Sequence, residues 1–299
     1  YLDQMLESNE IIYANRDRHF REIVKGFKTI NDADFEEPES LSRIMRKYQK
    51  NGYKWLRTLE AWKFGGILAD DMGLGKTVIT LTALWELALD RFDIGKILVI
   101  APKRVATDTW PKELKKWEHL TGLTASLVIG SQKQREEALD RPAFLYIINR
   151  ENVSWLVQNH CWDFDTVVID ELSSFKSNQA QRFKAMKKVR PLVNRVIGLT
   201  GTPAPNSLLD LWPQMYLLDM GQRLGRFITG YRERFFKPDK RNREIIYSYK
   251  PREGRSRKVD LLPDLGYLHF HESCGLSGYA GMYLQPCGSG DEPEREKHL

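Results

Sequence analysis

Cysteine is scarce in this chain, since only Cys161, Cys274 and Cys287 occur among its 299 residues. Thiols this few and this far apart do not form the disulfide framework of a small secreted domain, so we expect no disulfides and a reducing, cytoplasmic location. No apolar run approaches the ~20 residues of a membrane-spanning helix, and residues 1–25 carry too many charges for a signal peptide. We therefore expect no membrane partner.

Lys and Arg are absent from residues 259–294 and concentrated in residues 223–258, which hold thirteen Lys or Arg against four Asp or Glu. This local surplus of nine exceeds the net charge of +6 for the whole chain, so the remaining residues are slightly acidic. Tyr231, Tyr247 and Tyr249 lie among these basic residues, a mixture that can follow a phosphate backbone. A solvated basic face is an equal alternative, and the sequence leaves both open.

The length and the apolar content limit the number of domains. A chain of 299 residues with 41% apolar residues can bury one large α/β core with appendages, but hardly two full lobes of a large enzyme. The first residue is Tyr1, so we expect this chain to be a piece of a longer protein.

Residues 65–77 (GGILADDMGLGKT) have the pattern of a phosphate-binding loop. An apolar strand over residues 67–69 runs into a glycine-rich turn, and a helix follows, so backbone N–H groups and a helix N-terminus converge on one anion. In such loops the lysine reaches the β- and γ-phosphates and the hydroxyl ligates magnesium. The residues expected around the nucleotide are Asp71, Met72, Gly73, Leu74, Gly75, Lys76 and Thr77.

One position departs from the general phosphate-loop pattern, because Asp70 stands where G-x-x-x-x-G-K-[ST] has its first glycine. The alternative interpretation is an ordinary glycine-capped turn before a core helix. Upstream, residues 45–56 (MRKYQKNGYKWL) predict a helix that carries Gln49. Its carboxamide can donate to and accept from an adenine edge at once, although a lone glutamine on a helix is often only solvated.

Strand and helix patterns alternate after the loop, which favours a parallel sheet covered by helices. Lys103 and Arg104 follow one strand, and residues 107–117 predict a helix with a basic face and two tryptophans. Ligands of such sheets bind beyond the carboxyl ends of the strands, so the residues after each strand are site candidates. The expected strands are residues 67–69, 96–101, 127–129, 144–148, 166–169 and 194–200.

Two of these strand ends carry further candidate chemistry. Asp170 and Glu171 follow a buried strand, where one carboxylate can hold magnesium and the other can orient and deprotonate water. A solvated acidic pair in a turn is the alternative. One strand later, the hydroxyls of Thr200 and Thr202, on either side of Gly201, can hydrogen-bond the acidic pair and sense a γ-phosphate.

Together these motifs resemble the first ATPase lobe of the Swi/Snf-type DNA translocases of helicase superfamily two. The resemblance spans residues 45–212 and includes ILADDMGLGKT, LVIAPKRVATDTW, VVIDEL and LTGTPAPNSLLDLW. It implies a three-layer RecA-like α/β fold and the cofactors ATP and Mg²⁺. Under this resemblance Gln49 contacts adenine, Lys76 and Thr77 bind phosphate and magnesium, and Asp170 and Glu171 form the acidic pair. Thr200, Gly201 and Thr202 would couple nucleotide state to DNA.

The resemblance also implies a DNA partner, with Lys103 and Arg104 facing the backbone of double-stranded DNA and giving little sequence specificity. The sequence departs from the family at two places. Leu172 and Ser173 follow the acidic pair where the family often has Ala and His or Gln, and the arginine-rich motif of the second lobe is not found. We expect feeble hydrolysis without that lobe, since an arginine finger contributes about 10³ to 10⁵ in turnover.

The predicted organisation is a helical appendage and acidic linker over residues 1–40, the ATP-binding lobe over 41–222, a basic helical extension over 223–258 and an irregular tail, disordered or non-native, over 259–299. His269, His271, Cys274 and Cys287 in the tail match no zinc template. The predicted function is an ATP-dependent translocase on double-stranded DNA. The alternatives are a nucleotide-gated DNA-binding module without productive hydrolysis and a nucleotide-binding protein of another phosphate-loop family.

Overall fold

The computed structural model describes residues 45–61, 66–70, 73–202, 207–241, 246–252 and 268–269. The predictions for residues 1–40, and all but two residues of the predicted tail, lie outside these ranges. Within the described residues, no helix is long and apolar enough to cross a membrane.

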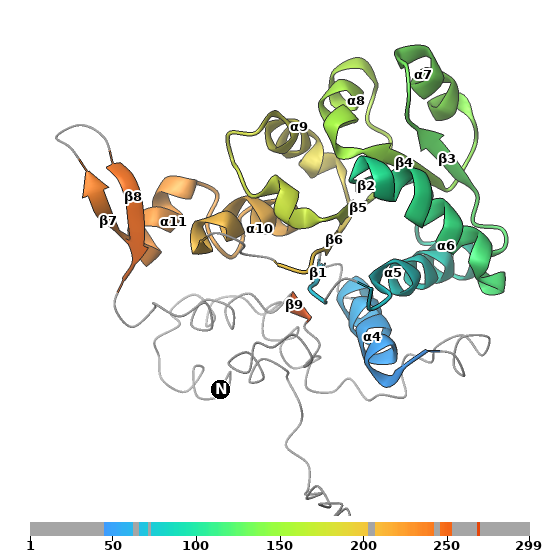
Figure 1. The fold of residues 1–299 in the computed structure, drawn as a ribbon, viewed down its shortest axis with the longest axis horizontal. Coiled ribbons are helices and arrows are strands. Elements are labelled where there is room, and N and C mark those ends of the chain that lie inside the picture. The colour runs from blue at the N-terminus through green and yellow to red at the C-terminus, as the bar shows by residue number, and fades with distance from the viewer. Residues whose placement is uncertain are drawn as a thin grey trace, which may run out of the picture.

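The core of the molecule is a parallel sheet with the strand order β3-β4-β2-β5-β6-β1-β9 (Figure 1). Every pairing in this sheet is parallel, so all strands end on the same side. Strands β1, β2 and β4 are buried along their whole length, which explains their continuous apolar sequences. The strands are β1 (Gly66–Leu68), β2 (Ile97–Ala101), β3 (Ala125–Val128), β4 (Leu145–Asn149), β5 (Thr166–Asp170), β6 (Arg195–Leu199) and β9 (Leu268–His269).

Helices cover both faces of the sheet, because successive strand residues point to opposite sides. Leu98 and Ile100 pack with Phe183 in one core cluster, whereas Ile97 and Val99 pack with Trp110 in the other. Figure 1 shows α4, α5 and α6 on one side and α8, α9 and α10 on the other. The helices are α4 (Lys47–Ala61), α5 (Lys76–Trp85), α6 (Trp110–Lys116), α7 (Gln132–Asp140), α8 (Val153–Asn159), α9 (Gln181–Val189), α10 (Leu211–Asp219) and α11 (Ile228–Phe235).

This three-layer arrangement confirms the predicted α/β fold. Short turns complete it, among them a π-turn, η3 (Val105–Thr109), which joins the end of β2 to α6. Most of the predicted strands lie within one residue of the observed bounds, as β5 shows with Thr166–Asp170 against the predicted 166–169.

The predicted helical extension over residues 223–258 is wrong after α11. Strands β7 (Phe236–Arg241) and β8 (Ile246–Pro251) pair in an antiparallel two-stranded sheet, with register shifts around Lys240. The sequence of β8 alternates β-branched, aromatic and polar residues, which suits a strand, and Pro238 is tolerated because β7 is an edge strand. The predicted irregular tail also needs a correction, since β9 pairs with β1.

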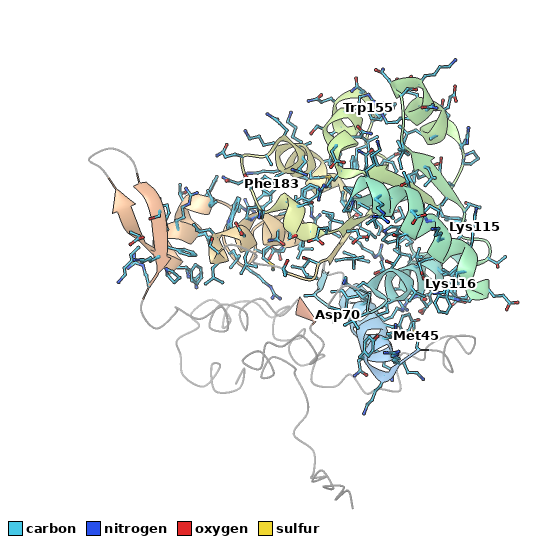
Figure 2. The ribbon with its side chains drawn as sticks, in the orientation of Figure 1. Met45, Asp70, Lys115, Lys116, Trp155 and Phe183 are labelled. Carbon is cyan, nitrogen blue, oxygen red and sulfur yellow. The ribbon has the colours of Figure 1, made fainter. Side chains whose placement is uncertain are left out.

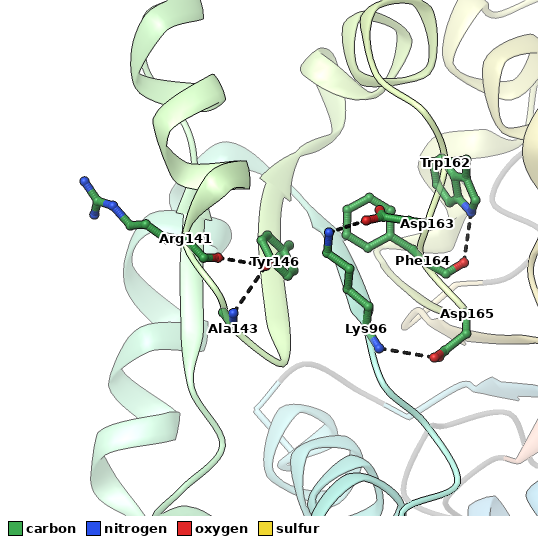
Figure 3. A network of polar contacts seen from close by, with 8 residues as sticks. All are labelled: Lys96, Arg141, Ala143, Tyr146, Trp162, Asp163, Phe164 and Asp165. Atoms are coloured by element: carbon green, nitrogen blue, oxygen red, sulfur yellow. Dashed lines mark hydrogen bonds and ion pairs between the residues drawn. The ribbon is translucent and has the colours of Figure 1, made fainter.

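At the amino end of the sheet, a network of polar contacts ties the starts of β2, β4 and β5 together (Figure 3). The Lys96 ammonium pairs with Asp163 and lies 4.6 Å from the centre of the Tyr146 ring. The Asp165 carboxylate accepts the backbone N–H groups of Gly95 at 2.7 Å and Lys96 at 3.1 Å. These contacts link the segments that precede β2 and β5 to each other and to β4, so we interpret this end of the sheet as structural.

Candidate functional site

Three of the predicted motifs follow the carboxyl ends of three neighbouring strands. Strands β1, β6 and β5 are neighbours, with Leu68 opposite Leu199 and Leu199 opposite Asp170. Neighbouring strands are about 4.8 Å apart, so the loop after β1, the turn after β6 and the carboxylates after β5 meet within two strand spacings. The candidate site is therefore at the carboxyl end of the sheet, as the sequence predicted.

The loop between β1 and α5 has the backbone that its glycines allow. Gly73 and Gly75 both have φ of +84°, in the left-handed region, and Gly75 is the N-cap of α5. A Cβ atom at Gly75 would lie 2.4 Å from Nε2 of Gln49, so no larger residue fits without movement. Leu74 completes this described part of the loop, whereas the candidates Asp71 and Met72 lie outside the described residues.

Lys76 and Thr77 occupy the first turn of α5 and are half-buried. The Lys76 ammonium donates to the backbone carbonyl of Asp70 at 2.7 Å, which holds its charge over the loop. Asp70 itself is 1% exposed at the end of β1, beside α4 and α5 (Figure 2). A helix N-terminus with a lysine beside it favours an anion such as a phosphate group.

Gln49 contacts the loop directly. Its Nε2 donates to the backbone carbonyl of Leu74 at 3.1 Å, and its Oε1 accepts the backbone N–H of Arg46 at 3.0 Å. Helix α4 is held at a second point, where the buried Arg57 donates to Glu86, the residue after α5, at 2.5 Å. Gln49 is thus part of the site, and its predicted contact with adenine stays a prediction.

Asp170 is the last residue of β5, and one of its oxygens is held by a side chain that the sequence did not assign to the site. The indole Nε1 of Trp110 donates to Asp170 Oδ2 at 2.9 Å. Burial raises the pKa of the Asp170 carboxyl, while the Trp110 hydrogen bond and the Lys76 charge act to lower it and the Glu171 charge to raise it. Trp110 and Lys76 therefore favour the ionised carboxylate.

Glu171 has a backbone conformation that is rare for a residue with a side chain, with φ of 59° and ψ of 60°. Non-glycine residues in the left-handed region are uncommon and often lie at functional sites. Its Oε1 accepts from the hydroxyl of Thr200 at 3.4 Å and from that of Ser173. Ser173 lies at one of the two places where the sequence departs from the family that it resembles, and its hydroxyl contacts the acidic pair.

The turn after β6 connects the acidic pair to the loop. The backbone N–H of Thr200 donates to the Leu68 carbonyl at 3.2 Å, and its hydroxyl accepts the N–H of Thr202 at 3.2 Å. A Cβ at Gly201 would lie 3.6 Å from the Asp70 carbonyl oxygen. Thr200 thus reaches Glu171 through its hydroxyl as predicted, whereas Thr202 contributes its backbone N–H.

Lys103 and Arg104 are exposed at the end of β2, the strand beside β5. The hydroxyl of Thr107 donates to both their carbonyls, at 3.1 and 3.2 Å, which holds the turn. These two side chains lie at the same end of the sheet as the phosphate loop, so they are available to a large polyanion near the site.

The donor set at the carboxyl end suits magnesium. Among the described residues no group of three or more His, Cys, Asp or Glu could hold a metal ion by itself. Magnesium, however, is usually bound through one or two carboxylates together with substrate phosphates and water. The Asp170 carboxylate and the Thr77 hydroxyl are hard oxygen donors of this kind, so the residues fit the ion.

The sequence did not assign Trp110 or Ser173 a role in the site. Trp110 is separated from Asp170 by 60 positions in the sequence, so no local pattern pairs them. A weak signal existed, because a tryptophan follows closely on the strand-end pair Lys103 and Arg104 in a helix predicted to cover the sheet.

Comparison with known sequences gives one family. The sequence model of the SNF2-related domain matches residues 48–238. The chain is 42% identical over 174 residues to putative protein p41 of Acyrthosiphon pisum secondary endosymbiont phage 1, covering 56% of this chain and 38% of that protein. It is 38% identical over 171 residues to an uncharacterized ATP-dependent helicase of Mycoplasma genitalium, covering 56% of this chain and 16% of that protein.

Comparison with solved structures gives the same result. The SWI2/SNF2 ATPase core of Sulfolobus solfataricus in complex with dsDNA matches with a TM-score of 0.57 and 28% identity. The match covers 67% of this chain and 41% of that chain. The chain thus spans less than half of the relatives and the solved structure that it resembles.

Proposed function

The chain belongs to the SNF2-related family, and on this basis we propose that it is the ATP-binding lobe of an ATP-dependent translocase acting on double-stranded DNA. The observation that carries the proposal is the meeting of three motifs at the carboxyl end of the sheet. The phosphate loop with Lys76, the strained acidic pair and the Thr200 turn are linked by contacts of 2.7 to 3.4 Å.

Each residue has a role that its position supports. Lys76 and the N-terminus of α5 would bind the β- and γ-phosphates, and Gln49 would contact the adenine beside the loop. Glu171 would orient a water molecule and accept its proton, with Thr200 and Ser173 holding the carboxylate. Asp170 and Thr77 would hold Mg²⁺, which neutralises charge on the phosphate oxygens when bound.

Double-stranded DNA is the proposed polyanion. The solved neighbour from Sulfolobus solfataricus was obtained with dsDNA, and the exposed Lys103 and Arg104 lie at the nucleotide end of this sheet. Contacts from such side chains go to phosphates, so binding should weaken steeply with salt and depend little on sequence. If neither double-stranded DNA nor RNA binds at low salt, this part of the proposal is wrong.

A second ATPase lobe is part of the proposal, since the chain spans 41% of the solved ATPase core. We expect that lobe to supply the arginine finger, which contributes about 10³ to 10⁵ in turnover. We therefore expect this chain to bind ATP, whereas efficient hydrolysis should require the full-length protein.

The substitution Lys76→Ala tests the nucleotide site. Loss of a charge-assisted contact to phosphate should weaken binding of a fluorescent ATP analogue by at least about tenfold. The matched control is Lys96→Ala, which removes a lysine of similar burial from the amino end of the same sheet and should leave binding unchanged. Undiminished binding in Lys76→Ala would contradict the proposed function.

A further inference from the structure

Trp110 is the largest fully buried side chain of the described residues. The N–H of its indole ring, which is the only hydrogen-bonding group of the ring, donates to Asp170 of the acidic pair. The side chain is 0% exposed and belongs to the core cluster of α5 and β2. Packing alone would explain a buried tryptophan. It does not explain why the indole N–H points at Asp170 Oδ2, 2.9 Å away.

The path of the chain places the indole there. Strand β2 lies beside β5 with Ile100 opposite Ile169, so the end of β2 is next to Asp170. The exposed turn of Lys103 and Arg104 follows, and then the π-turn η3, after which the N–H of Trp110 bonds to the Val105 carbonyl. π-turns inside helices are rare and are often found at functional sites. One short segment therefore connects the exposed basic turn with the carboxylate.

An indole N–H is a donor and cannot accept, so Oδ2 of Asp170 is the acceptor in this contact. Holding Oδ2 fixes the rotation of the carboxyl group and with it the direction of the other oxygen. Groups that hydrogen-bond a metal-binding carboxylate in this way orient it, and their loss typically costs tenfold to a hundredfold in metal affinity.

We propose that Trp110 is a positioning residue that orients Asp170 for magnesium and joins the Lys103–Arg104 turn to the nucleotide site. The inference rests on the proposed function and deepens it. It assigns a role in metal binding to a buried core side chain on the segment that we propose to face DNA. Movement of the basic turn on DNA would change the orientation of Asp170 through Trp110.

The test uses Trp110→Phe, which keeps an aromatic ring in the core and removes the N–H. Binding of a fluorescent ATP analogue is titrated with Mg²⁺ and repeated in EDTA. We expect the Mg²⁺ concentration at half-maximal effect to rise about tenfold to a hundredfold, with binding in EDTA unchanged. An unchanged Mg²⁺ dependence in a folded Trp110→Phe protein would overturn the inference.

Trp117→Phe is the matched control. Trp117 lies one residue beyond the same helix, and its N–H donates to Glu113 at 2.6 Å instead of to the site. Its loss should leave the Mg²⁺ dependence as in the unsubstituted chain. In the background of Asp170→Asn, Trp110→Phe should cause no further change in Mg²⁺ dependence, since coupled residues are not additive.

A second measurement leaves Trp110 in place, in case Trp110→Phe does not fold. In an NMR spectrum of the tryptophan indole N–H groups, Asp170→Asn should shift the Trp110 resonance and so identify it. The same resonance should shift when Mg²⁺ and ADP are added to the unsubstituted chain. If Mg²⁺ and ADP shift only other indole resonances, the inference is overturned. If the unsubstituted chain binds nucleotide no better than Lys76→Ala, the proposed function fails instead, so the two failures are distinguishable.

Discussion

At the carboxyl end of the sheet Lys76 donates to a backbone carbonyl, whereas at the amino end Lys96 pairs with the carboxylate of Asp163 and lies over the rings of Tyr146 and Phe164. Lys76 begins helix α5 and Lys96 directly precedes strand β2, and both are partly buried. The first holds its charge over a glycine loop, and the second pairs with a carboxylate that is 56% exposed. The same residue type is thus placed for a ligand at one end and for stability at the other.

Backbone conformation differs between the groups that make the polar contacts at the two ends. The carboxyl end has Gly73, Gly75 and Glu171 in the left-handed region, and the Thr200 turn closes on them. At the amino end, the N–H groups of Gly95 and Lys96 are satisfied by Asp165, without a positive φ in either residue. The carboxylate of Glu171, whose backbone is left-handed, is held by the hydroxyls of Ser173 and Thr200.

Substitutions at the two ends of the sheet should differ most in their effect on catalysis. Glu171→Gln removes the proposed base, so DNA-stimulated phosphate release by the full-length protein should fall about 10² to 10⁴-fold, with ATP binding retained. Asp163→Asn removes a carboxylate from the amino end and should leave the rate of release unchanged. ATP-dependent DNA retention without any release in the unsubstituted protein would instead favour a nucleotide-gated binding module.

The sequence predicted the carboxyl end well because its signals are local. Strands buried on both faces are continuous apolar runs, so β2 and β5 were found nearly to the residue. β3 was placed less well, at 127–129 instead of Ala125–Val128, because it is an edge strand whose residues alternate between exposed and buried. The hairpin of β7 and β8 was missed because its basic residues outweighed the strand pattern.

Contacts between distant residues were beyond the sequence. The carboxamide of Gln49 reaches the carbonyl of Leu74 across 25 positions, and Trp110 reaches Asp170 across 60. The residue types predicted the chemistry of each motif, but the register of the strands determines which side chains of different motifs come into contact. The predicted roles of Thr77 and Lys103 depend on bound ligands, so they stay predictions.

A smaller effect is expected from two glycines that share a backbone conformation. Gly75 has φ of +84° at the phosphate loop, and Gly122 has φ of +98° in the turn before β3. Alanine at either position should destabilise the fold by about 1 to 2 kcal/mol, measured by chemical unfolding. Only Gly75→Ala should also weaken binding of an ATP analogue, about tenfold, because its Cβ would meet Gln49.

If Gly75→Ala and Gly122→Ala lose nucleotide binding equally, the comparison fails, because the loss then follows global stability. If both variants bind the ATP analogue as tightly as the unsubstituted chain, the loop tolerates a side chain at Gly75. The comparison is sharpened only when the two variants lose similar stability and differ in binding.

The smallest expected effect is a pH dependence carried by His119, which lies before β3 on the amino-end side. The Thr82 hydroxyl donates to the Val78 carbonyl at 2.8 Å, and its oxygen lies 3.0 Å from Nε2 of His119. Burial lowers the pKa of this imidazole below its ordinary value of 6.5. The unfolded chain therefore binds the proton more readily than the folded one.

Stability from neutral His119 should thus be complete above pH 6.5 and be lost as the pH falls towards the folded-state pKa, with a slope of at most about 1.4 kcal/mol per pH unit. His119→Gln keeps a donor and removes the titration, so the free energy of unfolding should fall less between pH 7 and pH 6. An identical slope in the variant would contradict this assignment. Nucleotide binding over the same range should be equal in both proteins, because His119 contacts α5 away from the loop, at Thr82 and Trp85.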